Sequence, residues 1–425
     1  MSPAAPDACR LLELGCGDGG NLVPMAYALP DSAFCGVDLS ARAIAHAGEL
    51  RDALSLANVE LHQADLTALP DLGTFDYVVA HGVYSWIAPE ARDALLAACR
   101  AHLAPGGVAY VSYDVMPGGH VREITRQILR WHLRDVDDPA ERIAGARALL
   151  RALADAGSEQ AEWALDQGDP ALYHDELAPH HEAILFTDFV DHAGRHGLDF
   201  LAEADVFEMQ ASGLPAEYAA GDVIAREQYL DFFKGRMFRQ TLLGHAGAER
   251  REPSGDVVRD MLAATPARPV GEVGPGRVEF RGPRGATITT DHDAVKAALV
   301  ALGDAWPAAV PVAELDGDDD AICEALLRAY AVNLVQLHVR APEIAITPSE
   351  RPMASALARL QAATGSRITN LRHGSVEVPD ELGRRLITLL DGTRDRAALL
   401  RELDRPAEEL ERSLEGLARL AVLEG

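Results

Sequence analysis

Short apolar runs alternate with amphipathic stretches between residues 10 and 113. The runs have the length and composition of strands that are buried on both faces, and the stretches between them have apolar residues at the three- and four-residue spacing of helices. This alternation is typical of repeated βα units and predicts a doubly wound parallel sheet. The expected strands are 10–14, 33–37, 59–63, 77–81 and 108–113, with helices that include 41–57 and 90–102.

The pattern changes after the fifth expected strand. Residues 121–156 have helical periodicity, interrupted at 137–139, where a proline suits the first turn of a new helix. A further amphipathic helix is expected at 187–196, and strands are expected at 198–204 and 238–243. The last two strands would complete a seven-stranded sheet, and 121–185 would form a helical insertion.

The final third of the chain predicts a separate α+β region. Residues 266–276 are rich in proline and glycine and indicate a linker, followed by a hairpin of 278–280 with 287–289. Segments 289–339 and 376–425 share an order of elements that predicts two winged-helix-like units. The expected parts are a core (1–120), the insertion (121–185), completion of the sheet (186–250), a linker and hairpin (251–288) and the carboxyl-terminal domain (289–425).

Composition limits the possible partners. The chain has 425 residues and a net charge of −27, with no strong basic patch, so we expect no nucleic-acid partner. Its five cysteines are odd in number and scattered, which indicates no disulfide framework and no zinc site; we expect no metal and a cytoplasmic location. The apolar runs fall short of the roughly 20 residues that cross a bilayer, so no membrane insertion is expected. The oligomeric state stays open.

The sequence LLELGCGDGGN at 11–21 is the strongest local signal. An apolar strand enters a glycine-rich turn, and a helix starts near Asn21, so Gly15, Gly17 and Gly19 can let a ligand approach the backbone closely. Exposed N–H groups at such a turn favour an anion such as a carboxylate. Asp38 closes the second strand, where a carboxylate can accept hydrogen bonds from ribose hydroxyls. Dinucleotide-binding enzymes share these two features, and a glycine turn can also be purely structural.

Three further features resemble class I methyltransferases that use S-adenosylmethionine (SAM): Glu13, Asp65 in QADL, and LAPGG at 103–107. The resemblance implies a Rossmann-like SAM-binding sheet, with Asp65 beside the adenine amine and Leu66 on the adenine ring. A structural cap is the alternative role of Asp65. The expected cofactor-binding residues are Glu13, Gly15, Cys16, Gly17, Asp38, Leu39, Asp65, Leu66 and His81.

Two loops rich in aromatic and polar residues follow the fourth and fifth strands, AHGVYSWI at 80–87 and VSYDVMPGG at 111–119. Ligands of doubly wound sheets bind at this carboxyl edge. Tyr84, Trp86 and Tyr113 are expected to form an aromatic slot around the accepting atom, and Asp114 to orient it; ordinary core packing is the alternative for the aromatic rings. The insertion is expected over this acceptor pocket, with Tyr173, His174 and Glu176 as contact residues.

The segments ELGCGDGGN, AHGVYSW, VSYDVMPGG and REQYLDFFKGRMFRQTLLGH resemble bacterial methyltransferases that carry a methyltransferase regulatory domain. That group includes protein-lysine methyltransferases of outer-membrane proteins. The resemblance implies methyl transfer from SAM to a nucleophile, with a protein lysine amine as the expected acceptor. The alternatives are a small-molecule N- or O-methyltransferase, a SAM-binding or regulatory module without catalysis, and an NAD-dependent dehydrogenase, whose usual glycine spacing lacks the extra Gly19.

Overall fold

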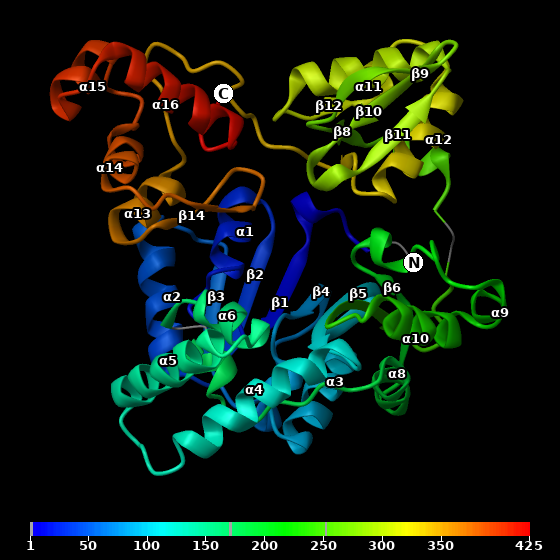
Figure 1. Ribbon diagram of the computed structural model, residues 1–425, viewed down its shortest axis with the longest axis vertical. Coiled ribbons are helices and arrows are strands. Elements are labelled where there is room, and N and C mark those ends of the chain that lie inside the picture. Colours follow the sequence, from blue (N-terminus) through cyan, green and yellow to red (C-terminus); the bar gives the residue numbers. More distant parts are fainter. Residues whose placement is uncertain (1–2, 170–171, 251–252) are drawn as a thin grey trace.

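The computed structural model describes residues 3–169, 172–250 and 253–425. Within them, the largest sheet has seven strands in the order β3-β2-β1-β4-β5-β7-β6 (Figure 1). The first five strands pair in parallel, and β7 is antiparallel to both of its neighbours. This confirms the predicted fold class. The strands are β1 (Arg10–Leu14), β2 (Ala33–Asp38), β3 (Val59–Gln63), β4 (Phe75–Ala80), β5 (Leu103–Asp114), β6 (Leu198–Glu203) and β7 (Phe238–His245).

Alternate residues of β1 enter hydrophobic cores on opposite faces of the sheet. Leu12 and Leu14 pack with helices α3 and α8, whereas Leu11 packs with Leu22 of α1. Because side chains alternate along a strand, a nearly continuous apolar run fits a sheet covered on both faces. The helices around the sheet are α1 (Leu22–Ala28), α2 (Ala41–Ala53), α3 (Pro89–His102), α8 (Phe186–Arg195), α9 (Ala216–Ala219) and α10 (Val223–Lys234).

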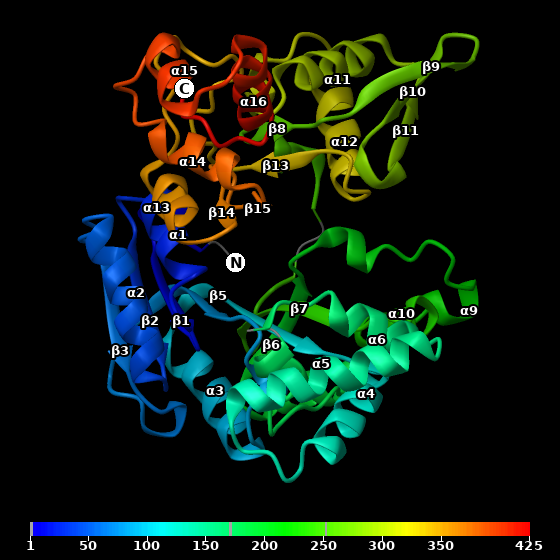
Figure 2. The same cartoon turned by 60° about the vertical axis from the view of Figure 1, so that its left-hand side comes forward.

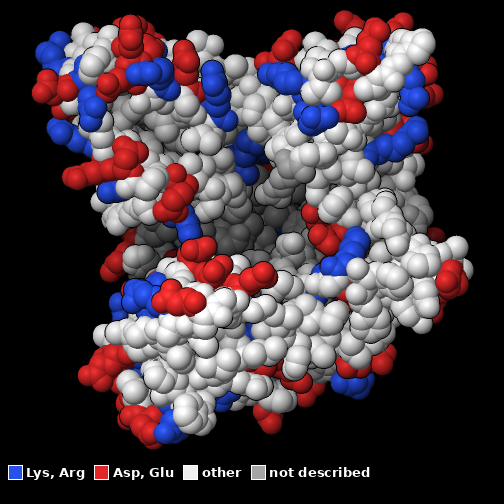
Figure 3. All heavy atoms as spheres, viewed as in Figure 1, with Lys and Arg blue, Asp and Glu red and all other residues white. Residues whose placement is uncertain are grey.

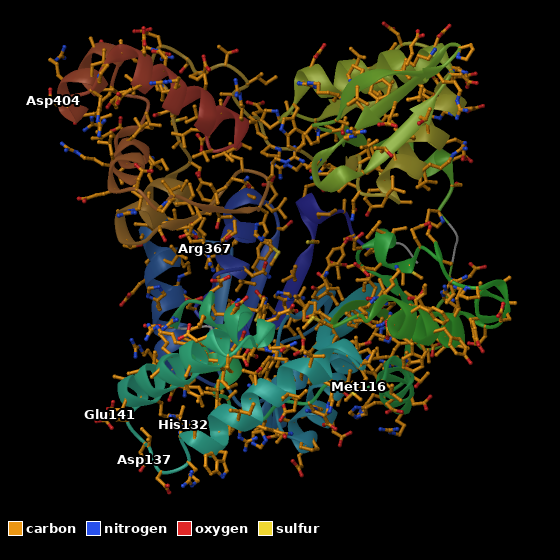
Figure 4. The ribbon with its side chains drawn as sticks, viewed as in Figure 1. Met116, His132, Asp137, Glu141, Arg367 and Asp404 are labelled. Atoms are coloured by element: carbon orange, nitrogen blue, oxygen red, sulfur yellow. The ribbon has the colours of Figure 1, made fainter. Side chains whose placement is uncertain are left out.

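The predicted insertion is helical and has a small core of its own. It contains α4 (Gly118–His132), α5 (Pro139–Asp155), α6 (Glu159–Leu165) and the π-helix η4 (Leu172–Glu176). The interruption expected at 137–139 is confirmed, since the Asp138 side chain caps α5 by accepting a hydrogen bond from Glu141 N. Figure 4 places His132, Asp137 and Glu141 around the turn between α4 and α5, at the outer edge of the molecule.

The segment after β7 is folded where a linker was expected. Strand β9 (Arg268–Gly274) pairs with β10 (Arg277–Arg281), so the linker prediction over 266–276 is wrong. Most of β9 is exposed, so it has no buried apolar face whose periodicity could reveal it. The predicted hairpin is confirmed by the pairing of β10 with β11 (Thr287–Thr290). The same core includes β8 (Leu262–Ala264), α11 (Asp293–Ala305), β12 (Val310–Pro311), α12 (Asp319–Tyr330) and β13 (Gln336–His338).

The end of the chain folds back onto the first helix of the sheet domain. Tyr27 on α1 donates from its hydroxyl to Glu424 Oε1 at 3.3 Å and accepts from Ala356 N at 3.2 Å. Figure 2 shows this part beside α1, and Figure 3 shows a hollow between the upper lobes and the lower body, with acidic and basic side chains interspersed. Its elements are α13 (Ala356–Thr364), β14 (Arg367–Thr369), β15 (Ser375–Glu377), α14 (Glu381–Leu389), α15 (Arg396–Leu403) and α16 (Ala407–Arg419).

In the described part of the chain, no helix has both the length and the apolar character needed to span a membrane.

Candidate cofactor site and active site

The turn after β1 leaves room for a ligand at one of its glycines. Gly15 and Gly17 have φ values of 75° and 55°, in the left-handed region that favours glycine. Gly15 N and Cys16 N donate to Val37 O at 2.8 and 3.0 Å, which ties the turn to the end of β2. A Cβ on Gly17 would meet no atom of the described residues within 4 Å. The turn is therefore open on that side.

Asp38, the last residue of β2, is held in one orientation by two backbone amides. Its Oδ2 accepts from Gly17 N at 2.9 Å, and its Oδ1 accepts from Ser40 N at 2.8 Å. Ser40 in turn caps α2 by accepting from Ala43 N. The carboxylate is thus fixed between the glycine turn and the start of α2, and its remaining lone pairs can accept hydrogen bonds from a ligand.

Two cavities meet at Asp38. We name the smaller one, of about 430 Å³, the inner cavity, and the larger one, of about 1240 Å³, the outer cavity. The inner cavity is lined by Gly15, Val37, Asp38, Leu39, Ala64, Asp65, Leu66, Gly82, Val83, Trp86, Ile87, Ala88, Ala91 and His180. The outer cavity is lined by Gly17, Asp18, Asp38, Ser40, Arg42, Ala43, Ala45, His46, Glu49, Pro139, Ile143, Asp169, Tyr173 and His174. Six expected site residues, Gly15, Asp38, Leu39, Asp65, Leu66 and Trp86, thus meet around one space.

Glu13 is a buried carboxyl two residues before the turn. Asn21 Nδ2 donates to its Oε1 at 2.8 Å, whereas its Oε2 has no hydrogen-bond partner among the described residues. Burial raises the pKa of Glu13 from 4.5 to about 7. Glu13 is not among the described residues that line either cavity, but a buried carboxylate oxygen without a partner is costly, so a cationic ligand group that reached it would be favourable.

Asp65 is both a cap and a lining residue. Its Oδ1 accepts from Thr67 N and Thr67 Oγ1, at 2.8 and 2.7 Å, at the start of η2 (Leu66–Ala68). These hydrogen bonds lower the pKa of Asp65 and leave Oδ2 for a ligand. Asp65 therefore caps η2, and this does not exclude a role in ligand binding. Leu39 lines the inner cavity and is 67% exposed, so its side chain offers an apolar surface to a ligand.

Two other expected cofactor residues lie away from this space. The Cys16 thiol is buried in the core formed by α1 and β1, burial raises its pKa to about 12, and its backbone N–H donates to Val37 O. His81 Nδ1 lies 3.1 Å from the Tyr110 hydroxyl and 3.0 Å from Ser112 Oγ. His81 is not among the described residues that line either cavity.

The expected aromatic slot needs a correction at two of its three rings. Tyr113 stacks on Phe189 with 3.9 Å between ring centroids, and Tyr84 packs edge-on against the same ring. Both tyrosines are buried in the sheet's core and are not among the described lining residues. The alternative of core packing therefore fits them, because their side chains point to the face of the sheet that α8 covers. Trp86 alone of the three lines the inner cavity.

Asp114 belongs to a polar cluster beside Trp86. Its Oδ2 lies 2.7 Å from His181 Nε2, and His181 Nδ1 lies 3.0 Å from Glu123 Oε2. The His181 ring packs on Trp86 with 4.5 Å between centroids, and the Arg122 guanidinium lies 5.0 Å from the Trp86 ring. Neither His181 nor Arg122 belongs to a sequence motif, and His181 is 67 residues from Asp114, so the sequence pattern did not point to either residue.

The insertion contributes to the outer cavity. Tyr173 and His174 line it, opposite Asp38 and the start of α2. Glu176 lies elsewhere: it is buried and pairs with Arg122 Nε at 2.8 Å. The contacts therefore place the insertion against the side of the site where the glycine turn opens.

The strand order, the glycine turn after β1 and the acidic residue that ends β2 together define the fold of class I methyltransferases. Three segments match family models. Residues 12–109 match "Methyltransferase domain", 168–245 match "Predicted methyltransferase regulatory domain", and 350–419 match "PKMT, C-terminal winged helix domain". The chain thus has a class I methyltransferase domain followed by these two domains, as the resemblance implied. The expected winged-helix unit at 289–339 stays a prediction.

Individual proteins are similar to all or part of this chain. An uncharacterized protein of Rickettsia prowazekii is 34% identical over 253 residues, 56% of this chain and 46% of that protein. A trans-aconitate 2-methyltransferase of Azoarcus is 32% identical over 175 residues, 41% of this chain and 57% of that enzyme. The chain thus matches about half the length of these relatives. PKMT2 from Rickettsia typhi, solved with AdoHcy, has the same fold, with a TM-score of 0.86, 23% identity and coverage of 100% of this chain and 96% of that one.

Proposed function

We propose that the protein is a SAM-dependent methyltransferase whose cofactor binds across the inner and outer cavities. The observation that carries the proposal is the Asp38 carboxylate, which lines both cavities and is oriented by Gly17 N and Ser40 N. A carboxylate fixed in this way can accept hydrogen bonds from the two hydroxyls of a ribose.

The other residues fit the remaining parts of the same ligand. SAM supplies an activated methyl group on a sulfonium. Glu13 would balance the ammonium of the methionine part, and the open side of Gly17 would admit that part. Asp65 Oδ2 would accept from the adenine amine, with Leu39 and Leu66 as apolar walls.

For the acceptor we propose a protein lysine amine. An ammonium must lose a proton before it can attack, which costs about 4 kcal/mol from a pKa near 10.4 to pH 7.4. Trp86 lines the inner cavity and would contact the acceptor amine, and the nearby positive charges of Arg122 and Arg126 would disfavour an ammonium there. The buried Asp114–His181 pair packs behind the Trp86 ring and would hold it in place. The match of residues 350–419 to the PKMT winged-helix model supports a protein substrate. We further propose a cytoplasmic enzyme that does not bind nucleic acid.

A small-molecule acceptor is the second candidate, favoured by the similarity to trans-aconitate 2-methyltransferase. Both candidates need the same cofactor site, so cofactor binding tests the shared claim first.

Titration with S-adenosylhomocysteine, compared between the wild-type protein and Asp38→Ala, provides this test. Loss of hydrogen bonds from a charged acceptor should weaken binding by about 1–3 kcal/mol. Asp137→Ala is a matched control, because Asp137 lies at the outer turn between α4 and α5 (Figure 4). Equal affinity in Asp38→Ala and the wild-type protein would contradict the proposed site.

A further inference from the structure

Three metal-ligating side chains from two helices converge away from the cofactor cavities. His192 lies in the last turn of α8, and His196, four residues later, is the residue that ends the helix, so both side chains lie at the carboxyl end of α8. Asp93 reaches them from α3: its Oδ1 lies 2.8 Å from His192 Nε2 and 3.1 Å from His196 Nε2. The three ligand atoms all lie within 4.8 Å of one another.

We propose that Asp93, His192 and His196 bind a divalent transition-metal ion of the Zn²⁺ type. Tetrahedral zinc with ligand bonds of about 2.0–2.1 Å places neighbouring ligand atoms about 3.3 Å apart. The two distances to Asp93 Oδ1 are shorter than this value by half an ångström or less, and the three ligand atoms lie within 4.8 Å of one another, so side-chain shifts could bring all three to an ion. Two histidines at this helical spacing with one carboxylate are a ligand set that zinc prefers.

Access and hydrogen bonding also suit an ion. The Asp93 side chain is 64% exposed, which leaves a path for the metal and a position for a water ligand. A neutral histidine that binds a metal through Nε2 carries its proton on Nδ1. The Tyr84 hydroxyl lies 2.7 Å from His192 Nδ1, so its oxygen can accept a hydrogen bond from that N–H. Zinc binding therefore requires His192 to change its tautomer, but His192 keeps its hydrogen bond with Tyr84.

Two arginines, Arg92 and Arg195, act on Tyr84 beside the site. The Arg92 guanidinium lies 5.3 Å from the centre of the Tyr84 ring and forms an ion pair with Glu182, which balances its charge. The Arg195 charge opposes a cation here, and the Asp93 carboxylate, as a direct ligand, would offset it.

The site joins the methyltransferase domain to the regulatory-domain region. Asp93 lies on α3 within residues 12–109, whereas both histidines lie within 168–245. Tyr84, which contacts His192, begins η3 (Tyr84–Trp86), the segment that carries Trp86 into the inner cavity. A bound ion would clamp α3 to α8 and thereby stabilise the support of Trp86, without taking part in the methyl transfer.

Zinc titration of metal-free protein, followed by calorimetry and by thermal unfolding, tests the inference. We expect one equivalent of Zn²⁺ to bind and to raise Tm, and Co²⁺ to give the intense visible bands of a tetrahedral site. His196→Gln and Asp93→Asn should each weaken zinc binding at least tenfold. Both side chains are at least partly exposed, so these variants should fold even if His192→Gln does not.

His132→Gln is the matched control, because His132 lies at the end of α4, at the outer turn of the insertion (Figure 4), and should leave binding unchanged. The absence of zinc binding to the wild-type protein would overturn the inference and leave a hydrogen-bonded triad. Undiminished binding by both His196→Gln and Asp93→Asn would overturn it as well.

Discussion

Lowering the pH through 7 should weaken SAM binding because Glu13 becomes protonated. Burial raises the pKa of Glu13 to about 7, and a cationic ammonium favours its ionised form. Binding below this pKa therefore requires release of a proton. The ionised fraction falls from about 0.7 at pH 7.4 to about 0.1 at pH 6, so the affinity should fall about eightfold.

Calorimetry with S-adenosylhomocysteine across this pH range measures the effect, since its amino group stays mostly protonated there. Glu13→Gln removes the titrating group and should bind more weakly at neutral pH, with a nearly flat profile. Asp137→Ala should keep the wild-type slope. An unchanged slope in Glu13→Gln would refute the reasoning, because another group would then carry the titration.

The raised pKa of Glu13 also predicts how the stability of the unliganded protein depends on pH. The pKa of Glu13 is raised on folding, so its contribution to stability is fully present below 4.5 and is lost as the pH rises through 7. Above pH 7, Glu13→Gln should therefore unfold at a higher temperature than the wild-type protein, with a gain of at most about 3 kcal/mol. A less stable variant at that pH would contradict the assignment of a strained, buried carboxylate.

Three further changes test other parts of the account. Trp86→Ala should lower both cofactor affinity and turnover, measured by calorimetry and by methyl transfer, because Trp86 lines the same cavity as Asp38. Arg239→Ala should lower the free energy of unfolding by about 3–5 kcal/mol in denaturant titration, since it leaves the buried Glu203 without its cation, whereas Asp231 and Glu227 keep Arg236. His373→Ala should raise KM for SAM a few-fold with little change in Tm, because His373 Nε2 lies 3.1 Å from Asn21 Oδ1, and Asn21 holds Glu13.

The sheet could be predicted from sequence because strands such as β1 and β2 are nearly continuous buried apolar runs, separated by helical patterns. Residues 10–14 and 59–63 form β1 and β3 with the expected bounds. The glycine turn could be predicted as well, since glycines with positive φ and an acidic strand end are local features. The exposed strand β9 could not, because neither of its faces carries an apolar pattern.

The direction in which side chains point was the second feature that could not be predicted from the sequence. Tyr84 and Tyr113 belong to the expected loops, but which face of the sheet they enter depends on packing against Phe189 from a distant helix. Groups brought together over long separations were missed for the same reason. His181 joins Asp114 across 67 residues, and Asp93 joins His192 across 99.

The most direct test of the central claim is transfer of a labelled methyl group. Purified protein is incubated with methyl-labelled SAM and an extract of its own organism, and labelled proteins are hydrolysed and analysed for N-methyl-lysine. We predict label in protein lysine, with a large loss in Asp38→Ala at limiting SAM and no loss in Asp137→Ala. Label confined to small molecules would contradict the proposed acceptor, and the absence of any labelled acceptor while SAM is bound would contradict the proposed catalysis.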